Sequence, residues 1–243
     1  MDSEFGALPG FRLRGREISR MEGFSDSVFA FALTLLVVSL EAPKTYDQLM
    51  GIIRGLPAFA VCFLALVYFW MLHYQFFRRY GLVDITIVLL NTLLMFVVLF
   101  YVYPLKFLFT IMMGGLFGFR AIDSGGSAVA TITAEQGSQL LVLYGIGFAA
   151  MFWIISLMYL HAWRRREALE LTPVECFDTW FAMARFMAVG GVGVLSILIA
   201  LSVSPRYIGL AGLCYFSIGI IETVFGTYCG KRRERLLEPR TAP

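Results

Sequence analysis

Ionisable side chains inside long apolar stretches are the residues in this chain most able to do chemistry. They are few, and the candidates among them are Asp26, His73, Arg185 and Glu222, which all lie toward one side of the stretches that contain them. An ionised group at the centre of a bilayer costs about 3 kcal/mol or more, so each of these side chains needs a partner or a function. Two interpretations stay open: structural pairs that fix the helices, or a site that binds a small cation.

The composition predicts that these residues lie in a membrane. Of the 243 residues 59% are hydrophobic and only 15% are charged, with a mean hydropathy of +0.76. The apolar residues fall into six blocks, each long enough to cross a hydrocarbon core of about 30 Å as a helix. We therefore predict an all-α integral membrane protein with six transmembrane helices, bordered by prolines such as Pro57 and Pro104. The blocks lie at about 19–41, 54–77, 84–109, 139–163, 180–203 and 206–229.

Basic residues predict the orientation of these helices. Fifteen of the 20 Lys and Arg residues lie on the side that holds both termini, and cytoplasmic flanks carry such an excess. We expect a multi-pass protein of the cell membrane with both termini in the cytoplasm. Because the basic residues flank apolar blocks, with no polar face that they share with aromatic residues, no nucleic-acid partner is expected.

The predicted organisation follows from this topology. Residues 1–17 form a cytoplasmic N-terminal tail, residues 18–230 the six-helix transmembrane domain, and residues 231–243 a basic cytoplasmic C-terminal tail. The one long connection, residues 114–139, is expected outside the cytoplasm and is given no chemistry.

Catalytic motifs are missing from the sequence. It has no G-x-S-x-G elbow, no H-E-x-x-H zinc site and no G-x-x-x-x-G-K phosphate loop, and its four cysteines have no C-x-x-C spacing. Gly190, Gly191 and Gly193 lie inside an apolar block, where small residues favour close helix packing over phosphate binding. We expect no enzyme, no cofactor and no soluble substrate.

The first apolar block carries the most specific pattern. Arg20-x-x-x-Phe24-Ser25-Asp26 is followed by A-F-A-L-T-L-L at residues 30–36. The chain adds Phe69-Trp70 with His73 three residues on, then Asn91 and Tyr103-Pro104. Together these residues resemble the signature of the transmembrane protein 175 family, the endolysosomal and prokaryotic potassium channels. The resemblance covers about residues 18–109, and the last three blocks match only in hydropathy and length.

This resemblance implies an assembly and a function. Members with one six-helix unit are homotetramers in the lipid bilayer, whereas members with two fused units dimerise. The first helices of the subunits surround a central hydrophobic pore. The implied function is a potassium-selective channel whose only bound species is the permeant K⁺ ion.

Helical geometry indicates which face of the first helix meets that pore. Successive side chains turn by about 100°, so Leu35, Thr34 and Val38 all lie within about 60° of Phe31. Ser25 and Asp26 lie at least about 120° away on the same arithmetic, turned from this stripe. We therefore expect the signature residues to brace the pore helix from behind.

The resemblance assigns roles along the stripe. It aligns Phe31, Leu35 and Val38 with the family's hydrophobic constriction, which excludes ions when it is dry. Thr34 supplies a hydroxyl for cation selectivity. Since the family has Ile or Leu where this chain has Phe31, we expect Leu35 to be the narrowest point.

The expected brace is a polar network behind the stripe. Asp26 can accept hydrogen bonds from Arg20, His73 or Trp70, and Ser25 and Asn91 can complete the network. Its members are Arg20, Phe24, Ser25, Asp26, Trp70, His73 and Asn91.

The main alternative is a proton-conducting channel or a secondary transporter, since proton relays also use intramembrane Asp, His and Glu. No internal repeat is visible to support an inverted-repeat transporter.

Overall fold

Long α-helices make up nearly all of the computed structural model, which describes residues 11–15, 17–38, 43–117, 133–204 and 209–237. Six helical segments are long and apolar enough to cross a membrane, which confirms the predicted fold class. They comprise α1 (Arg20–Val38), α2 (Tyr46–Tyr80), α3 (Ile85–Phe117), α4 (Ala134–Arg164), α5 (Pro173–Ser202) and a last segment in three parts. That last segment is α6 (Gly209–Leu213), a 3-10 turn η2 (Cys214–Phe216) and α7 (Ser217–Leu237).

The helix ends differ from the apolar blocks because polar caps set them. Thr45 caps the start of α2 by accepting a hydrogen bond from the backbone of Gln48, so α2 begins at Tyr46, eight residues before the expected border of about 54. Gly81, with a φ of 58°, ends α2 in the left-handed conformation that favours glycine. Thr133 and Thr172 begin α4 and α5 with capping boxes.

Two expectations about helix borders are wrong. Pro57 and Pro104 lie inside α2 and α3. Transmembrane helices tolerate an interior proline because neighbouring groups can satisfy the carbonyl four residues earlier, which loses its N–H donor. The Tyr144 hydroxyl donates to the carbonyl of Pro104 at 2.6 Å, which ties α4 to α3 near this position. α7 also continues through the start of the expected C-terminal tail, and residues 118–132 of the expected loop lie outside the described residues.

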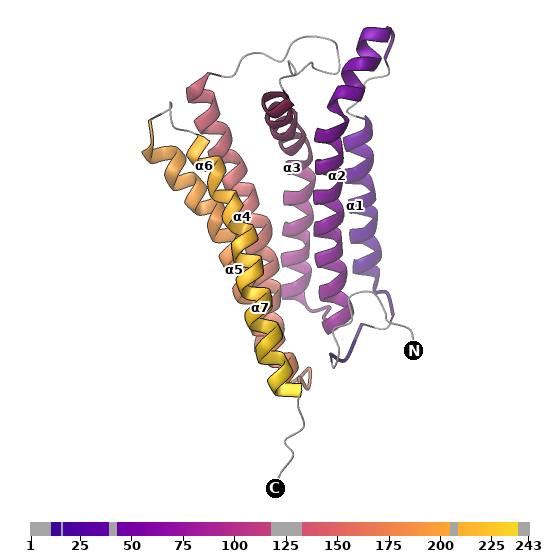
Figure 1. The fold of residues 1–243 in the computed structure, drawn as a ribbon. Helices are drawn as coiled ribbons and strands as arrows, with labels where there is room; N and C mark the ends of the chain where they lie inside the picture. Colours follow the sequence, from indigo (N-terminus) through magenta and orange to yellow (C-terminus); the bar gives the residue numbers. More distant parts are fainter. Residues whose placement is uncertain (1–10, 16, 39–42, 118–132, 205–208, 238–243) are drawn as a thin grey trace.

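The helices form a bundle in which α1 lies at the right-hand edge of Figure 1, while α4, α5 and α7 make up the left-hand side. α1 packs against α2 and α3, α4 packs most extensively against α5, and α7 lies on the outer side of α5. The core between them is rich in aromatic rings, including Phe76, Phe77 and Tyr159.

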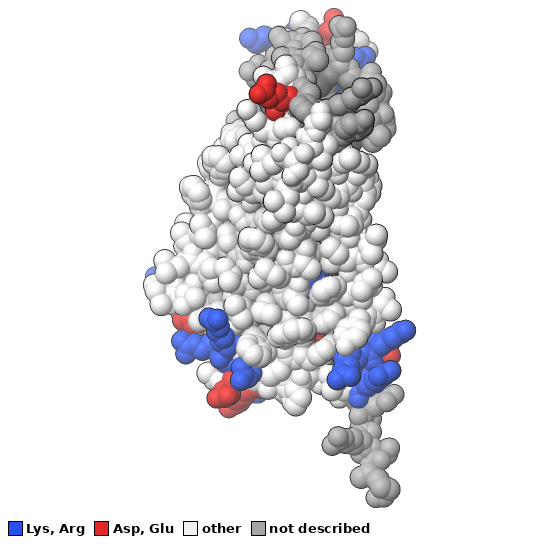
Figure 2. Space-filling view, turned by 90° about the vertical axis from the view of Figure 1, so that its left-hand side faces the viewer, with Lys and Arg blue, Asp and Glu red and all other residues white. Residues whose placement is uncertain are grey.

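Charged side chains gather at the ends of the bundle. Figure 2 shows a broad band in which charge is almost absent, above a lower end rich in Lys, Arg, Asp and Glu. The first and last described residues both lie at this lower end (Figure 1). The uncharged band is the part of the surface that suits the hydrocarbon of a bilayer.

Residues 11–15, within the expected N-terminal tail, pack against the helix bundle. Phe11 is 7% exposed, and its ring packs edge-on against Tyr80 at the end of α2. Arg14 makes an ion pair with the buried Glu175 of α5. Hydropathy does not reveal this packing because the segment is short and basic; residues 1–10 lie outside the described part.

Close contact between α4 and α5 depends on glycine. A Cβ atom on Gly193 would lie 2.8 Å from the carbonyl oxygen of Gly145, and one on Gly145 would lie 2.8 Å from that of Gly193. The two backbones therefore touch where these residues cross, as small residues permit in membrane helices. The expected packing role of the glycine group in α5 holds for Gly190 and Gly193, whereas a Cβ on Gly191 would meet nothing within 4 Å.

Replacing Gly193 with alanine should destabilise the bundle, because the new methyl group must push two helix backbones apart. We expect Gly193→Ala to lower the free energy of unfolding by ~1–3 kcal/mol, the usual cost of overpacking. Gly191→Ala is the matched control and should be neutral or stabilising by up to ~1 kcal/mol, since alanine favours helix. Thermal unfolding in detergent measures both, and equal melting temperatures for the two variants would contradict the assignment.

Candidate functional site

The inward face of α1 is defined by side chains three and four residues apart. Ser25, Phe29, Ala32 and Leu36 are buried against the neighbouring helices. This spacing keeps one side of a helix in continuous contact with a partner. The helix begins with a reciprocal cap, in which Glu22 accepts from the backbone of Ser19 at 2.9 Å and Ser19 accepts from that of Glu22 at 3.2 Å.

A buried hydrogen-bonded chain connects three helices behind α1. His73 Nε2 of α2 lies 2.9 Å from Asn91 Oδ1 of α3, and Asn91 Nδ2 donates to Ser25 Oγ of α1 at 2.8 Å. Ser25 in turn donates to the carbonyl of Met21 at 3.0 Å. Because the amide oxygen of Asn91 can only accept, His73 must donate through Nε2, which fixes its tautomer. All three side chains are at most 2% exposed, so this series of hydrogen bonds is shielded from solvent.

Asp26 makes a separate contact with α2. Trp70 Nε1 donates to Asp26 Oδ1 at 2.8 Å, and the indole ring stacks on Tyr74 with centroids 5.7 Å apart. Ser25 and Asp26 leave α1 about 100° apart, as neighbouring helical residues must. One therefore reaches α3 while the other reaches α2.

The expected brace is therefore brought together only in part. One set of hydrogen bonds joins His73, Asn91 and Ser25. A separate hydrogen bond joins Trp70 and Asp26. Arg20 is exposed and makes no ion pair with Asp26 among the described residues, and Phe24 is 61% exposed.

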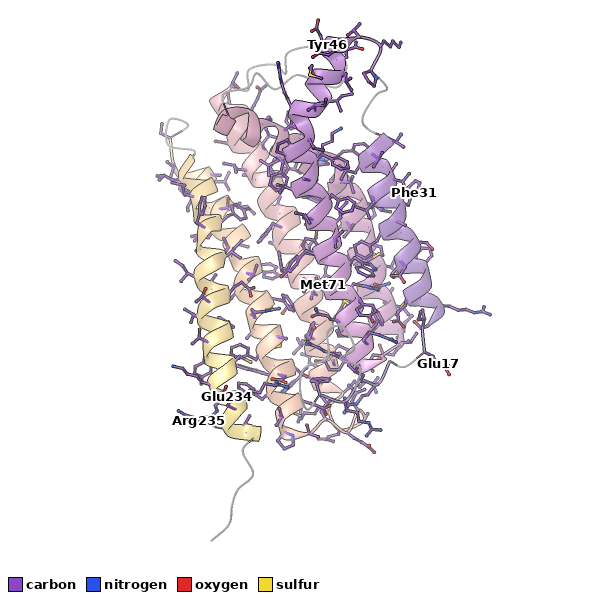
Figure 3. The ribbon with its side chains drawn as sticks, turned by 45° about the vertical axis from the view of Figure 1, so that its right-hand side comes forward. Glu17, Phe31, Tyr46, Met71, Glu234 and Arg235 are labelled. Atoms are coloured by element: carbon purple, nitrogen blue, oxygen red, sulfur yellow. The ribbon has the colours of Figure 1, made fainter. Side chains whose placement is uncertain are left out.

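The outward face of α1 carries the predicted stripe. Phe31 is 55% and Val38 67% exposed, Thr34 is exposed beside them, and Figure 3 shows Phe31 pointing away from the bundle. Leu35 differs, because it is half-buried and packs on the core. The Leu35 side chain is directed partly toward the buried face, so Phe31 is the more exposed of the two apolar side chains.

Hydroxyl groups on this face are satisfied within their own helix. Thr34 Oγ1 donates to the carbonyl of Ala30 at 2.9 Å, and Ser27 Oγ donates to that of Gly23 at 2.9 Å. With each proton directed at the backbone, the oxygen lone pairs remain available on the outward side. An oxygen in this state can accept, or lie against a cation, but has no proton left to donate.

The remaining intramembrane charges lie far from α1 in the fold. Arg185 of α5 pairs with Glu222 of α7 at 3.2 Å, one of the structural pairs that the sequence left open. A second α5–α7 pair, Arg233 with Asp178 at 3.0 Å, was not expected from the sequence. Within the described residues no group of three or more His, Cys, Asp or Glu side chains could hold a metal ion.

Comparisons with known proteins agree on one family. Residues 20–101 match the family model described as endosomal/lysosomal potassium channel TMEM175. A potassium channel of Marivirga tractuosa is 39% identical over 96% of this chain and 96% of its own length. A potassium channel of Streptomyces collinus is 31% identical over 56% of this chain and 64% of that protein.

Solved structures agree with the fold. A crystal structure of a variant of the potassium channel MtTMEM175, bound to a nanobody fusion, superposes with a TM-score of 0.79. It is 37% identical and the match covers 93% of this chain and 99% of that one. A TMEM175 homologue from Chamaesiphon minutus shares the fold, with a TM-score of 0.50 at 19% identity over 85% of this chain and 96% of that one. These relatives are channels and not enzymes, as expected, and this chain belongs to the TMEM175 family of potassium channels.

Proposed function

We propose that the protein is a potassium-selective channel of the cell membrane, a homotetramer whose pore is lined by the four copies of α1. The observation that carries this proposal is the division of α1 into two faces. Ser25 ties the buried face of α1 to α3, and the exposed Asp26 ties a flank of α1 to α2. Phe31, Thr34 and Val38 remain exposed in the protomer. The names of the relatives support potassium as the permeant ion.

The proposed gate is a hydrophobic constriction. Rings of Phe31 and Val38, with part of Leu35, surround the axis, and such a ring conducts only when it is wide enough to hold water. Phe31 forms the narrowest point in this proposal, in place of Leu35, because its ring is larger and more fully exposed.

The proposed selectivity element is Thr34. Its hydroxyl proton is bound to the carbonyl of Ala30, so a ring of four oxygens with free lone pairs faces the axis and replaces part of the water shell of K⁺.

Both termini lie in the cytoplasm in this proposal, because most Lys and Arg residues are on the side of the termini.

The alternative, a proton relay or a coupled transporter, has less support from the contacts. Asp26 is bound to Trp70, Glu222 to Arg185 and Asp178 to Arg233, so these acids already have partners. A transporter would give a small, saturable flux in place of stepwise currents.

Exchange of Thr34 for alanine should weaken selectivity. In a planar bilayer with potassium, sodium and proton gradients, the wild type should give stepwise currents that reverse near the potassium equilibrium potential. We expect Thr34→Ala to move the reversal potential toward that of sodium, because four oxygens leave the pore. Thr223→Ala is the matched control, since Thr223 is also exposed and donates to the carbonyl four residues back at 2.7 Å, but on α7. Identical reversal potentials for Thr34→Ala and the wild type would remove Thr34 from the mechanism.

Loss of the Asn91 amide should loosen α1. Asn91→Leu keeps a similar volume but leaves the buried Nε2–H of His73 without an acceptor, at a cost of about 1–3 kcal/mol. We expect a lower melting temperature, a lower yield of tetramer and a reduced current. Thr92→Val is the control on the same helix, because Thr92 is exposed and bonds only to its own helix. Light scattering gives the assembly state, and an Asn91→Leu variant that matches the control in all three readouts would refute the brace.

A further inference from the structure

The short segment before α1 packs against the ends of two other helices. Residues 11–15 lie outside the region that matches the family model, residues 20–101, and so does their main partner, Glu175. Phe11 lies under the guanidinium groups of Arg14 and Arg79, 6.0 and 5.5 Å from its ring centroid. The segment is therefore ordered by specific contacts.

Glu175 is the centre of these contacts. Its side chain is fully buried and accepts four hydrogen bonds, from Arg12 N at 2.7 Å, Thr172 N at 2.9 Å, and Arg14 Nη1 and Nη2 at 3.1 and 2.9 Å. A buried carboxylate is costly unless it is paired in this way. Only one of these donors, the Arg14 guanidinium, is a charged side chain.

Arg14 also reaches the connection between α4 and α5. Its Nε donates to the carbonyl of Leu169 at 2.8 Å and its Nη2 to that of Glu170 at 3.2 Å. A single side chain thus ties the segment to α5 and to the turn before it. Arg12 contributes its backbone but little else, since its side chain is 71% exposed and 3.9 Å from Glu170.

Gly15 fixes the segment to the end of α2. Its N–H donates to the carbonyl of Arg78 at 3.1 Å, and Arg78 Nη1 donates back to the carbonyl of Gly15 at 2.7 Å. A Cβ atom at this position would lie 2.3 Å from the carbonyl oxygen of Phe77, so only glycine fits. α2 is itself joined to α5 here, through the hydrogen bond between Tyr80 and Thr179 at 2.8 Å.

The pore helix begins immediately after this docked segment. Ser19, which caps α1, follows Gly15 by four residues, and four residues span at most about 14 Å. A fixed Gly15 therefore limits how far the start of α1 can move relative to α2 and α5.

We infer that Arg14 and Glu175 are positioning residues for the pore helix, an anchor that couples the start of α1 to the α4–α5 connection and slows its gating movement. This inference rests on the proposed function. Neither residue touches the ion; they act through the four-residue link to α1.

Single-channel recording tests the anchor. Arg14→Gln removes the charge that pairs with Glu175, and we expect open and closed dwell times to shorten by about fivefold or more, because charge-assisted hydrogen bonds no longer resist movement of α1. The reversal potential should stay at the wild-type value, since no pore residue changes. Arg12→Gln, the matched control, should keep wild-type dwell times. Dwell times of Arg14→Gln within twofold of the wild type would overturn the inference.

Two further measurements separate the anchor from folding and from conduction. Gly15→Ala breaks the docking on α2 without changing charge and should reproduce the shorter dwell times; if neither variant yields an assembled channel, the segment serves folding and the gating role is refuted. Amide hydrogen exchange in the first turns of α1 should quicken in Arg14→Gln and not in Arg12→Gln. That readout does not need a current, so a wild type that conducts no potassium would defeat the proposed function while exchange still tests the anchor.

Discussion

The rotation of α1 about its axis depends on the buried chain of His73, Asn91 and Ser25. In a bilayer the apolar residues of a helix do not strongly favour a neighbour over lipid, because lipid tails are equally apolar. A hydrogen bond in a dry setting is directional and costly to break, so it selects one rotation from many. Trp70 fixes the same helix from the other flank through Asp26. The outward direction of Phe31 and Thr34 follows from these contacts.

The other helices are held by two kinds of contact, close backbone packing and polar pairs. α4 and α5 meet where Gly145 faces Gly193, and α7 is held on α5 by the Arg185–Glu222 and Asp178–Arg233 pairs. The segment before α1 adds a third point of attachment, at the end where the termini lie. Helix α1 is thus held by α2 and α3 along its length and, through Arg14, by α5 at its start.

Much of this architecture could be predicted from the sequence, because the bilayer requires long apolar helices. Six blocks gave the six helices, and the 100° rotation placed Ser25 inside and Phe31 outside. The helix ends were less predictable, since caps such as Thr45 are polar and precede the apolar run. Arg20 was expected in the brace and lies outside it, because spacing along the chain does not reveal which donor reaches Asp26. The docking of Arg14 on Glu175 joins residues 161 positions apart, which no local pattern shows.

The central claim is that the outward stripe of α1 meets water in an assembled pore. Thr34→Cys, Val38→Cys and Val37→Cys test it directly, because Val37 is also exposed in the protomer but is turned by about 100° from Val38. A small cationic thiol reagent should block current through the channels with cysteine at 34 and 38. It should leave unchanged the channel with cysteine at 37 and the parent with its four native cysteines. Block at 37 with none at 34 and 38 would contradict the proposed pore face.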